Sequence, residues 1–256
     1  MPKERLQKII ARAGITSRRK AEAYITEGRV RVDGKVMSEL GAQADLSTQV
    51  VEIDGYGRVE PEEGVYILLH KPPHVVCTVS DPERRTTVID LLQNSRAQGS
   101  RNYEGMLPRV YPVGRLDYDT QGAILLTNDG ELSQKLLHPR HHVPKVYMAK
   151  VQGHPEESEL KKLRDGVYVG DPKRPGHGFR TKASGVRVAK RGPNNTWIEI
   201  TLAEGRNHQV KRMCEAIGHR TSRLIRIEFA GLDVNDLPPG GWRFLTKAEV
   251  AALRQW

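Results

Sequence analysis

A chain of 256 residues is long enough for one large domain or for a small domain joined to a larger one. Its 41 lysines and arginines against 31 acidic residues give a net charge of +10 and a pI of about 9.7, which favours a polyanionic partner such as nucleic acid. Two cysteines argue against a disulfide framework or a cysteine-ligated zinc site, and no signal peptide or membrane-spanning apolar stretch is recognisable, so we expect a soluble cytoplasmic protein with no membrane partner.

The first 60 residues have the pattern of a small separate domain. Apolar residues from Leu6 to Ala13 recur at helical spacing, and the glycine that follows would end this helix. Ser17 is placed to cap a second helix, which Gly28 would end. The alternation that follows predicts a hairpin and a further strand, with strands at 30–32 and 50–53 and a turn at 33–34.

Basic side chains gather at the turn between these two expected helices. They are Arg12, Arg18, Arg19 and Lys20, and we predict that they contact the phosphate backbone of RNA, although a solvated helix surface is the alternative. The sequence Ala-Gly-Ile-Thr-Ser-Arg-Arg at 13–19, with Gly-Arg-Val-Arg-Val-Asp-Gly-Lys at 28–35, resembles the S4 RNA-binding module. The resemblance implies recognition of folded RNA by its shape and backbone.

From residue 61 onward the chain predicts a second, larger domain, extending to residue 256. A polar segment at 56–64 forms a plausible linker, and the region 94–104 is expected to be a loop that touches RNA or moves freely. Strands and helices mix without a regular βα repeat, which predicts the α+β class. We expect strands at 65–69, 123–126, 146–151, 186–189 and 197–202, and helices at 131–137, 157–165, 210–217 and 248–254.

The polar loop at 114–122 is the strongest candidate for a functional site. Asp117 and Asp119 form a D-x-D pair, which would chelate a metal in a glycosyltransferase, but no other acidic cluster or glycine-rich phosphate loop supports that reading. Alternatively, Asp117 is a nucleophile or base, and Arg115 keeps it ionised by lowering its pKa. A surface ion pair that only closes a turn is the third possibility.

Motifs elsewhere in the chain favour the interpretation of Asp117 as a nucleophile. Gly-Arg-Leu-Asp-x-x-Thr-x-Gly at 114–122, followed by apolar residues and Thr-Asn-Asp-Gly, resembles the central motif of the RsuA-type pseudouridine synthases. The same family is matched, in order, at 69–78, at 145–147 and at 204–213. Many relatives have glycine where this chain has His74. The resemblance implies an S4 module, a catalytic domain with a mixed, largely antiparallel sheet, and conversion of uridine to pseudouridine without cofactor or metal.

The resemblance also assigns roles to individual residues. Asp117 aligns with the catalytic aspartate, and Tyr147 with the tyrosine that packs beside the flipped uracil and helps to remove the C5 proton. Lys211 falls on the basic position that pairs with the aspartate, although Arg206 could take that part instead. Arg206 and Arg212 are both expected to contact RNA. Whether the aspartate attacks the ribose, adds to the base or assists a glycal route stays open.

The target is suggested by smaller similarities. The segments 221–226 and 237–242 resemble the large-subunit enzymes of the family, whereas 141–142 and 208–211 resemble the small-subunit branch. We therefore expect a monomer that modifies 23S ribosomal RNA in an assembling large subunit, with 16S ribosomal RNA as the alternative. A non-catalytic RNA-binding factor with the same fold is a further alternative, but intact Asp117, Tyr147 and Lys211 argue against it.

Overall fold

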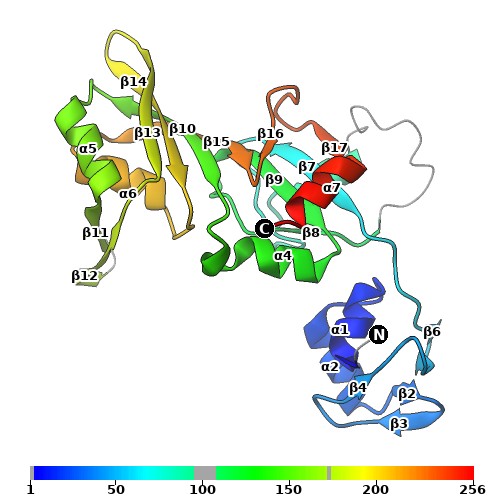
Figure 1. The fold of residues 1–256 in the computed structure, drawn as a ribbon. Coiled ribbons are helices and arrows are strands. Elements are labelled where there is room, and N and C mark those ends of the chain that lie inside the picture. The colour runs from blue at the N-terminus through cyan, green and yellow to red at the C-terminus, as the bar shows by residue number, and fades with distance from the viewer. Residues whose placement is uncertain (1–2, 95–107, 172–173) are drawn as a thin grey trace. The chain divides into compact units, whose positions relative to one another are not determined.

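The computed structural model describes residues 3–94, 108–171 and 174–256, so residues 95–104 of the predicted loop lie outside the described residues. The chain forms two compact units, which Figure 1 shows as ribbons. The first unit ends at Val65 and also contains residues 108–110 and 128–130, and the second holds the remainder. In the part of the chain that is described, no helix combines the length and the apolar character needed to cross a bilayer.

The described part of the first unit contains two helices and two small antiparallel sheets, of two and four strands, around one apolar core. Both predicted helices are present, as α1 (Leu6–Arg12) and α2 (Arg18–Thr26), and the Ser17 side chain caps α2 by accepting a hydrogen bond from the Lys20 amide. The predicted hairpin turn has two left-handed residues, at Asp33 and Gly34. The strands are β1 (Glu4–Arg5), β2 (Val30–Val32), β3 (Lys35–Met37), β4 (Gln43–Ala44), β5 (Val51–Ile53) and β6 (Gly57–Arg58).

The second unit is built on a mixed sheet, in the order β13-β14-β10-β15-β9-β7-β17, with β16 beside β15 and β8 beside β9. Among the described strands of this sheet, only β9 and β15 pair in parallel, so the expected α+β fold with a largely antiparallel sheet is confirmed. The strands are β7 (Tyr66–Lys71), β8 (Tyr111–Pro112), β9 (Gln121–Thr127), β10 (Lys145–Gln152), β13 (Gly185–Arg191), β14 (Asn195–Leu202), β15 (Thr221–Phe229), β16 (Leu232–Asp233) and β17 (Trp242–Phe244).

Helices and a separate hairpin complete the second unit. In Figure 1, α5 and α6 lie beside the part of the sheet formed by β10, β13 and β14, whereas α4 and α7 lie near β7 and β9. The sheet therefore has two apolar cores, one at each half. The elements are α3 (Val88–Asn94), α4 (Gly130–Leu137), the 3-10 helix η1 (Pro139–His141), α5 (Glu157–Asp165), the hairpin β11 (Val167–Asp171) and β12 (Arg174–Thr181), α6 (Gln209–Ala216) and α7 (Lys247–Leu253).

The parallel pair of β9 and β15 requires a glycine at position 122. Gly122 has a φ of 123°, and a Cβ atom placed on it would lie 2.1 Å from the backbone oxygen of Arg226. No other residue type fits this approach, because the contact is with rigid backbone rather than with a movable side chain. The last glycine of the 114–122 motif is thus explained by the packing of the two strands.

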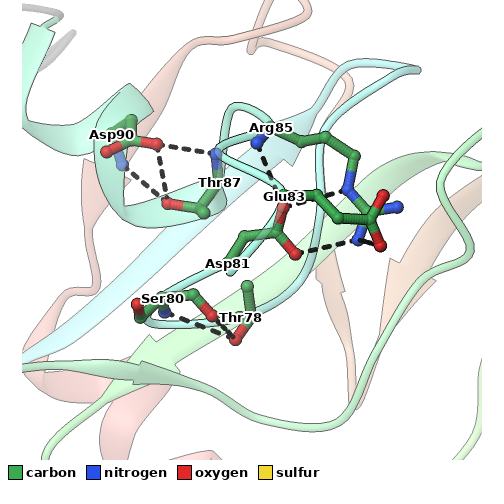
Figure 2. Close-up of polar contacts among 7 residues, drawn as sticks. All are labelled: Thr78, Ser80, Asp81, Glu83, Arg85, Thr87 and Asp90. Atoms are coloured by element: carbon green, nitrogen blue, oxygen red, sulfur yellow. Dashed lines mark hydrogen bonds and ion pairs between the residues drawn. The ribbon is translucent and has the colours of Figure 1, made fainter.

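The loop between β7 and α3 is held by two carboxylates, as Figure 2 shows. Asp81 accepts two hydrogen bonds from the Arg85 guanidinium, at 3.0 Å to Nε and 2.8 Å to Nη2, and these bonds hold the pKa of Asp81 below its ordinary value. Thr87 caps α3 by accepting from the Asp90 amide, while the Asp90 carboxylate accepts from the Thr87 amide at 2.8 Å. This reciprocal cap fixes the start of α3.

A half-buried ion pair in the second unit gives a testable pH dependence. Arg243 of β17 donates to both carboxylate oxygens of Glu249 in α7, at 2.9 and 2.6 Å, and these bonds lower the pKa of Glu249 from 4.5 to about 2. Because the pKa is lower in the folded than in the unfolded chain, the stabilisation is present at neutral pH and is lost as the pH falls from 4.5 towards 2. We expect Glu249→Gln to lower the free energy of unfolding by about 1–2 kcal/mol at neutral pH.

Urea denaturation at a series of pH values checks this expectation. The difference between wild type and Glu249→Gln should shrink as the pH falls below 4.5. The variant Glu215→Gln, which changes an exposed carboxylate on α6, serves as the control and should show a difference near zero throughout. A difference for Glu249→Gln that stays constant with falling pH would contradict the assignment.

Candidate active site

Asp117 lies on the loop that joins β8 to β9. The amide of Thr120 donates to the backbone oxygen of Asp117 at 3.0 Å and closes a turn. Leu116 is buried, and its amide donates to the Sγ atom of Cys77 at 3.3 Å, so the segment before α3 supports the loop from behind. The side chain of Asp117 is 29% exposed, which leaves its carboxylate partly open to solvent.

Lys71, the last residue of β7, fixes the backbone of this loop. Its side chain is fully buried, and Nζ donates to the carbonyl oxygens of Thr120 at 2.8 Å, Pro72 at 2.9 Å and Tyr118 at 3.3 Å. Burial lowers the pKa of Lys71 to about 8, although the nearby thiol of Cys77 and the carboxylates oppose this shift. The ammonium group therefore uses its three donors on the carbonyl groups around Asp117.

Two basic side chains lie beside the Asp117 carboxylate, and both come from the segment at the start of α6. Nε2 of His208 is 3.5 Å from Oδ1, and Nζ of Lys211 is 3.9 Å from Oδ2. Lys211 also donates to both oxygens of Asp119, at 2.6 and 2.7 Å. Burial alone would raise the pKa of Asp119, but the bond and charge of Lys211 lower it below its ordinary value. Lys211 is thus shared between two carboxylates.

The expected pairing of Arg115 with Asp117 is not found among the described residues, where the charged partners of Asp117 are His208 and Lys211. Leu116, between them, turns into the core and leaves Arg115 exposed, although Arg115 lines the same cavity as Asp117. Arg206 lines this cavity too, but its Nε is 3.3 Å from Glu204 and its guanidinium lies over the Phe179 ring. Of the two cations considered from the sequence, Lys211 is therefore the one beside Asp117.

Glu204 organises the segment that presents Lys211 and His208. Its Oε1 atom accepts from Thr181 Oγ1 at 2.6 Å and from Gln209 Nε2 at 2.8 Å, while the Arg206 amide donates to Gln209 Oε1 at 2.9 Å. His208 has a left-handed backbone, with a φ of 50°, just before α6 begins. The residues of the Glu-Gly-Arg-x-x-Gln motif thus form a hydrogen-bonded turn from which α6 begins.

A cavity of about 280 Å³ lies at Asp117. Tyr147, which is half-buried on β10, lines it together with Leu224 of β15. The remaining walls are mixed: Leu202, Val210 and Phe229 are among the apolar residues, and about as many polar or charged side chains line the cavity. A pocket that combines apolar walls, aromatic rings and one carboxylate suits a flat heterocycle held beside a nucleophile.

Two buried cations line the same cavity, and their burial is not evident from the sequence. Arg226 is 3% exposed, its Nε donates to the Ala123 oxygen at 2.8 Å, and its Nη2 is buried without a hydrogen-bond partner in the described structure. Lys145 donates to the Val143 oxygen at 2.9 Å, and burial, together with the charge of Arg226, lowers the pKa of Lys145 to about 8. This wall of the cavity favours ligand oxygen atoms that carry negative charge.

The predicted RNA-binding residues lie in both units, and each unit is described by itself. In the first unit, Arg18, Arg19 and Lys20 are exposed in the first turn of α2, whereas Arg12 is bonded to Glu4 at 3.1 Å. In the second unit, Arg212 lies over the Phe179 ring, and its guanidinium donates to the Gly170 oxygen. Arg206, the sixth predicted residue, contacts Glu204 and Phe179. Three of the six side chains are therefore open to solvent, and the other three have partners within the protein.

Each of the two units matches a known protein family. Residues 65–216 match the RNA pseudouridylate synthase family, and residues 4–50 match the S4 domain. The chain is 45% identical to a Bacillus subtilis protein named ribosomal large subunit pseudouridine synthase B, over 98% of this chain and 96% of that one. It is 39% identical to a Yersinia pestis protein of the same name, over 98% of this chain and 76% of that one.

A solved structure shows the same similarity in three dimensions. A protein described as a pseudouridylate synthase superposes with a TM-score of 0.62 at 28% identity, over 97% of this chain and 99% of that one. An Aquifex aeolicus protein described as an uncharacterised RNA pseudouridine synthase is 40% identical over 99% of this chain and 94% of its own length. The similarity therefore includes the S4 segment as well as the larger unit.

Proposed function

Because this chain belongs to the RNA pseudouridylate synthase family, and thus isomerises uridine to pseudouridine in RNA, we propose that its substrate is ribosomal RNA, with 23S favoured over 16S ribosomal RNA. The names of its bacterial relatives support this target. We assign residues 1–60 to RNA docking and residues 61–256 to catalysis. Two free, buried cysteines suit a reducing compartment, and we place the enzyme in the cytoplasm as a monomer on the assembling large subunit.

The observation that carries the assignment of the site is the position of Asp117 at a cavity also lined by Tyr147, with Lys211 beside the carboxylate. In the reaction the N1–C1′ bond breaks, the uracil turns and a C5–C1′ bond forms. The C5 proton leaves and N1 takes up a proton, and the bond that Asp117 forms to the substrate breaks again before release, so atoms balance and no electrons are gained or lost. Asp117 is the nucleophile, Lys211 stabilises its negative charge, and Tyr147 packs beside the uracil and assists removal of the C5 proton. Arg115 contributes positive charge at the edge of the cavity.

Tritium release from RNA labelled at uridine C5 tests the substrate. Unmodified transcripts of 23S and 16S ribosomal RNA are incubated with the full chain, and the pseudouridines are mapped by sequencing. We expect release from the 23S transcript at one position. Release from the 16S transcript alone would move the target to the small subunit, and release from neither would overturn the ribosomal RNA assignment.

The exposed cluster on α2 gives a prediction for RNA affinity. Replacing Arg18, Arg19 and Lys20 by glutamine should weaken binding to the substrate RNA and lower the slope of log affinity against log salt by about 0.7 to 0.9 for each phosphate group that is no longer neutralised. Fluorescence anisotropy at several salt concentrations measures both quantities. The control replaces Lys35 and Arg58, two exposed residues on strands of the same unit, by glutamine. This double variant should leave the slope nearly unchanged. An unchanged slope in the triple variant would contradict the assignment.

A further inference from the structure

A second cavity, of about 310 Å³, adjoins the one at Asp117. Leu224 of β15 lines both cavities, and the second one is also lined by Lys211 and Asp119, the ion pair beside Asp117. Its other walls come from the end of β7, the start of β9 and the start of β15, and comprise Pro73, His74, Gln121, Thr221, Ser222 and Arg223. The catalytic role proposed above uses none of these other wall residues.

Arg223 is fixed at this cavity by a relay of hydrogen bonds that begins in the core. Nδ1 of His70 lies 2.5 Å from the Leu237 oxygen, and because a carbonyl can only accept, Nδ1 carries the proton. Nε2 of the neutral ring therefore accepts from the amide nitrogen of Gln121, at 2.8 Å. The amide oxygen of Gln121 then accepts from Nη2 of Arg223, at 2.7 Å.

Burial favours the neutral form of His70 that this relay needs, since desolvation lowers the pKa of its ring, and the charge of Arg223 acts in the same direction. Arg223 has five N–H donors, of which Gln121 takes one. Within the described chain Arg223 has no carboxylate partner, and the acid of this cavity, Asp119, is bonded to Lys211. The cavity thus presents one guanidinium whose charge is uncompensated, a group suited to a phosphate.

His74 supplies a flat surface at the same cavity. Its backbone is left-handed, with a φ of 63°, which is unfavourable for a residue with a side chain. The conformation is maintained by a hydrogen bond from the His74 amide to the Tyr118 oxygen at 2.7 Å, and the two rings meet edge to face with centroids 5.3 Å apart. An exposed imidazole next to Pro73, held rigidly in this way, can stack on a nucleobase.

We propose that the second cavity binds the nucleotide next to the target uridine, with its phosphodiester against Arg223 and its base against His74. The proposal rests on the function proposed above, in which the uridine occupies the cavity at Asp117. An RNA strand that leaves that cavity must continue along an adjoining surface. The second cavity is such a surface, because Leu224 lines both cavities, and Asp119, two residues after Asp117, lines the second one together with Arg223. The cavity therefore selects RNA in which the neighbouring nucleotide is also unstacked.

A neutral linkage placed in the RNA tests the contact with Arg223. Substrate RNAs are prepared with a methylphosphonate in place of the phosphodiester on the 5′ or the 3′ side of the target uridine. The affinity and the rate of pseudouridine formation are measured for wild type and for Arg223→Gln. The matched control is Arg220→Gln, an exposed arginine outside both cavities that carries the same change of charge.

The effects of the neutral linkage and of Arg223→Gln on RNA affinity should not be additive, because both remove the same contact. One of the neutral linkages is expected to weaken binding to wild type about tenfold, Arg223→Gln should weaken binding of natural RNA to a similar extent, and their combination should cost little more. Arg220→Gln should leave the effect of the linkage intact. If the effects of both linkages add fully to that of Arg223→Gln, while wild type still forms pseudouridine, the second-cavity proposal is wrong. If wild type forms none in the natural RNA, the proposed function fails instead.

Discussion

Asp117→Asn is expected to abolish pseudouridine formation, with kcat reduced by about 10⁴-fold or more. The amide keeps the size of the carboxylate but cannot attack as a nucleophile, and it has no charge for Lys211 to stabilise. Tritium release under single-turnover conditions on the substrate RNA measures the loss directly. Because the substituted group lies partly exposed at the cavity, the fold should remain intact.

Two comparisons separate lost chemistry from lost structure. The affinity for RNA and the midpoint of thermal unfolding of Asp117→Asn should stay close to those of wild type. Asp165→Asn, which makes the same change at an exposed residue on α5, should keep full activity. Activity of Asp117→Asn within tenfold of wild type would show that another group is the nucleophile.

Lys71→Met is the second substitution with a large expected effect, and we expect it to lower kcat about 100-fold. Methionine fills the buried space of the lysine stem but leaves the carbonyl groups of Pro72, Tyr118 and Thr120 without their donor. The loop then loses its fixed backbone, and the Asp117 carboxylate is displaced from its position in the cavity. Lys71 is therefore a positioning residue for the nucleophile.

The split between kcat and KM distinguishes this role from general destabilisation. Lys71 is fully buried and faces the loop rather than the cavities, so the affinity for RNA and KM should change much less than kcat. Far-ultraviolet circular dichroism should match wild type at the assay temperature. A parallel loss in affinity and kcat, or a kcat within threefold of wild type, would contradict a positioning role.

The sequence is most informative where one local pattern determines the structure. Ser17 is expected to cap α2 and does so, and the apolar runs at 65–69 and 123–126 form the neighbouring strands β7 and β9. The 114–122 motif also locates Asp117, because a polar loop stands out against the apolar run that directly follows it. These features depend on neighbours in the chain, which a sequence displays directly.

Strand β15 is not predicted from the sequence, for a physical reason. Its arginines at 223 and 226 suggest a basic face towards RNA, yet β15 pairs with both β10 and β9, and Arg226 is buried beside Phe229. A buried arginine is rare, so composition alone favours exposure. The hairpin β11–β12 is not predicted either, since glycine and proline interrupt its pattern.

Contacts across long stretches of chain are equally hard to predict. Lys71 and His208 both belong to recognised motifs, but nothing in those motifs says that one holds the loop backbone and the other faces the Asp117 carboxylate. For Lys71 a signal exists, because a lysine that ends an apolar strand just before two prolines has little room to reach solvent. For His208 we find no comparable signal.

The short parallel pairing of β9 with β15 also has a consequence for how the enzyme reaches its active form. Lys211 and Asp119 are 92 positions apart, and Arg226 reaches the Ala123 oxygen across 103 positions. Closing loops of that length is entropically expensive and slow compared with forming the local hairpins. We therefore expect catalytic competence to be acquired late in folding, and a newly made chain to acquire it only after residue 226 has been synthesised.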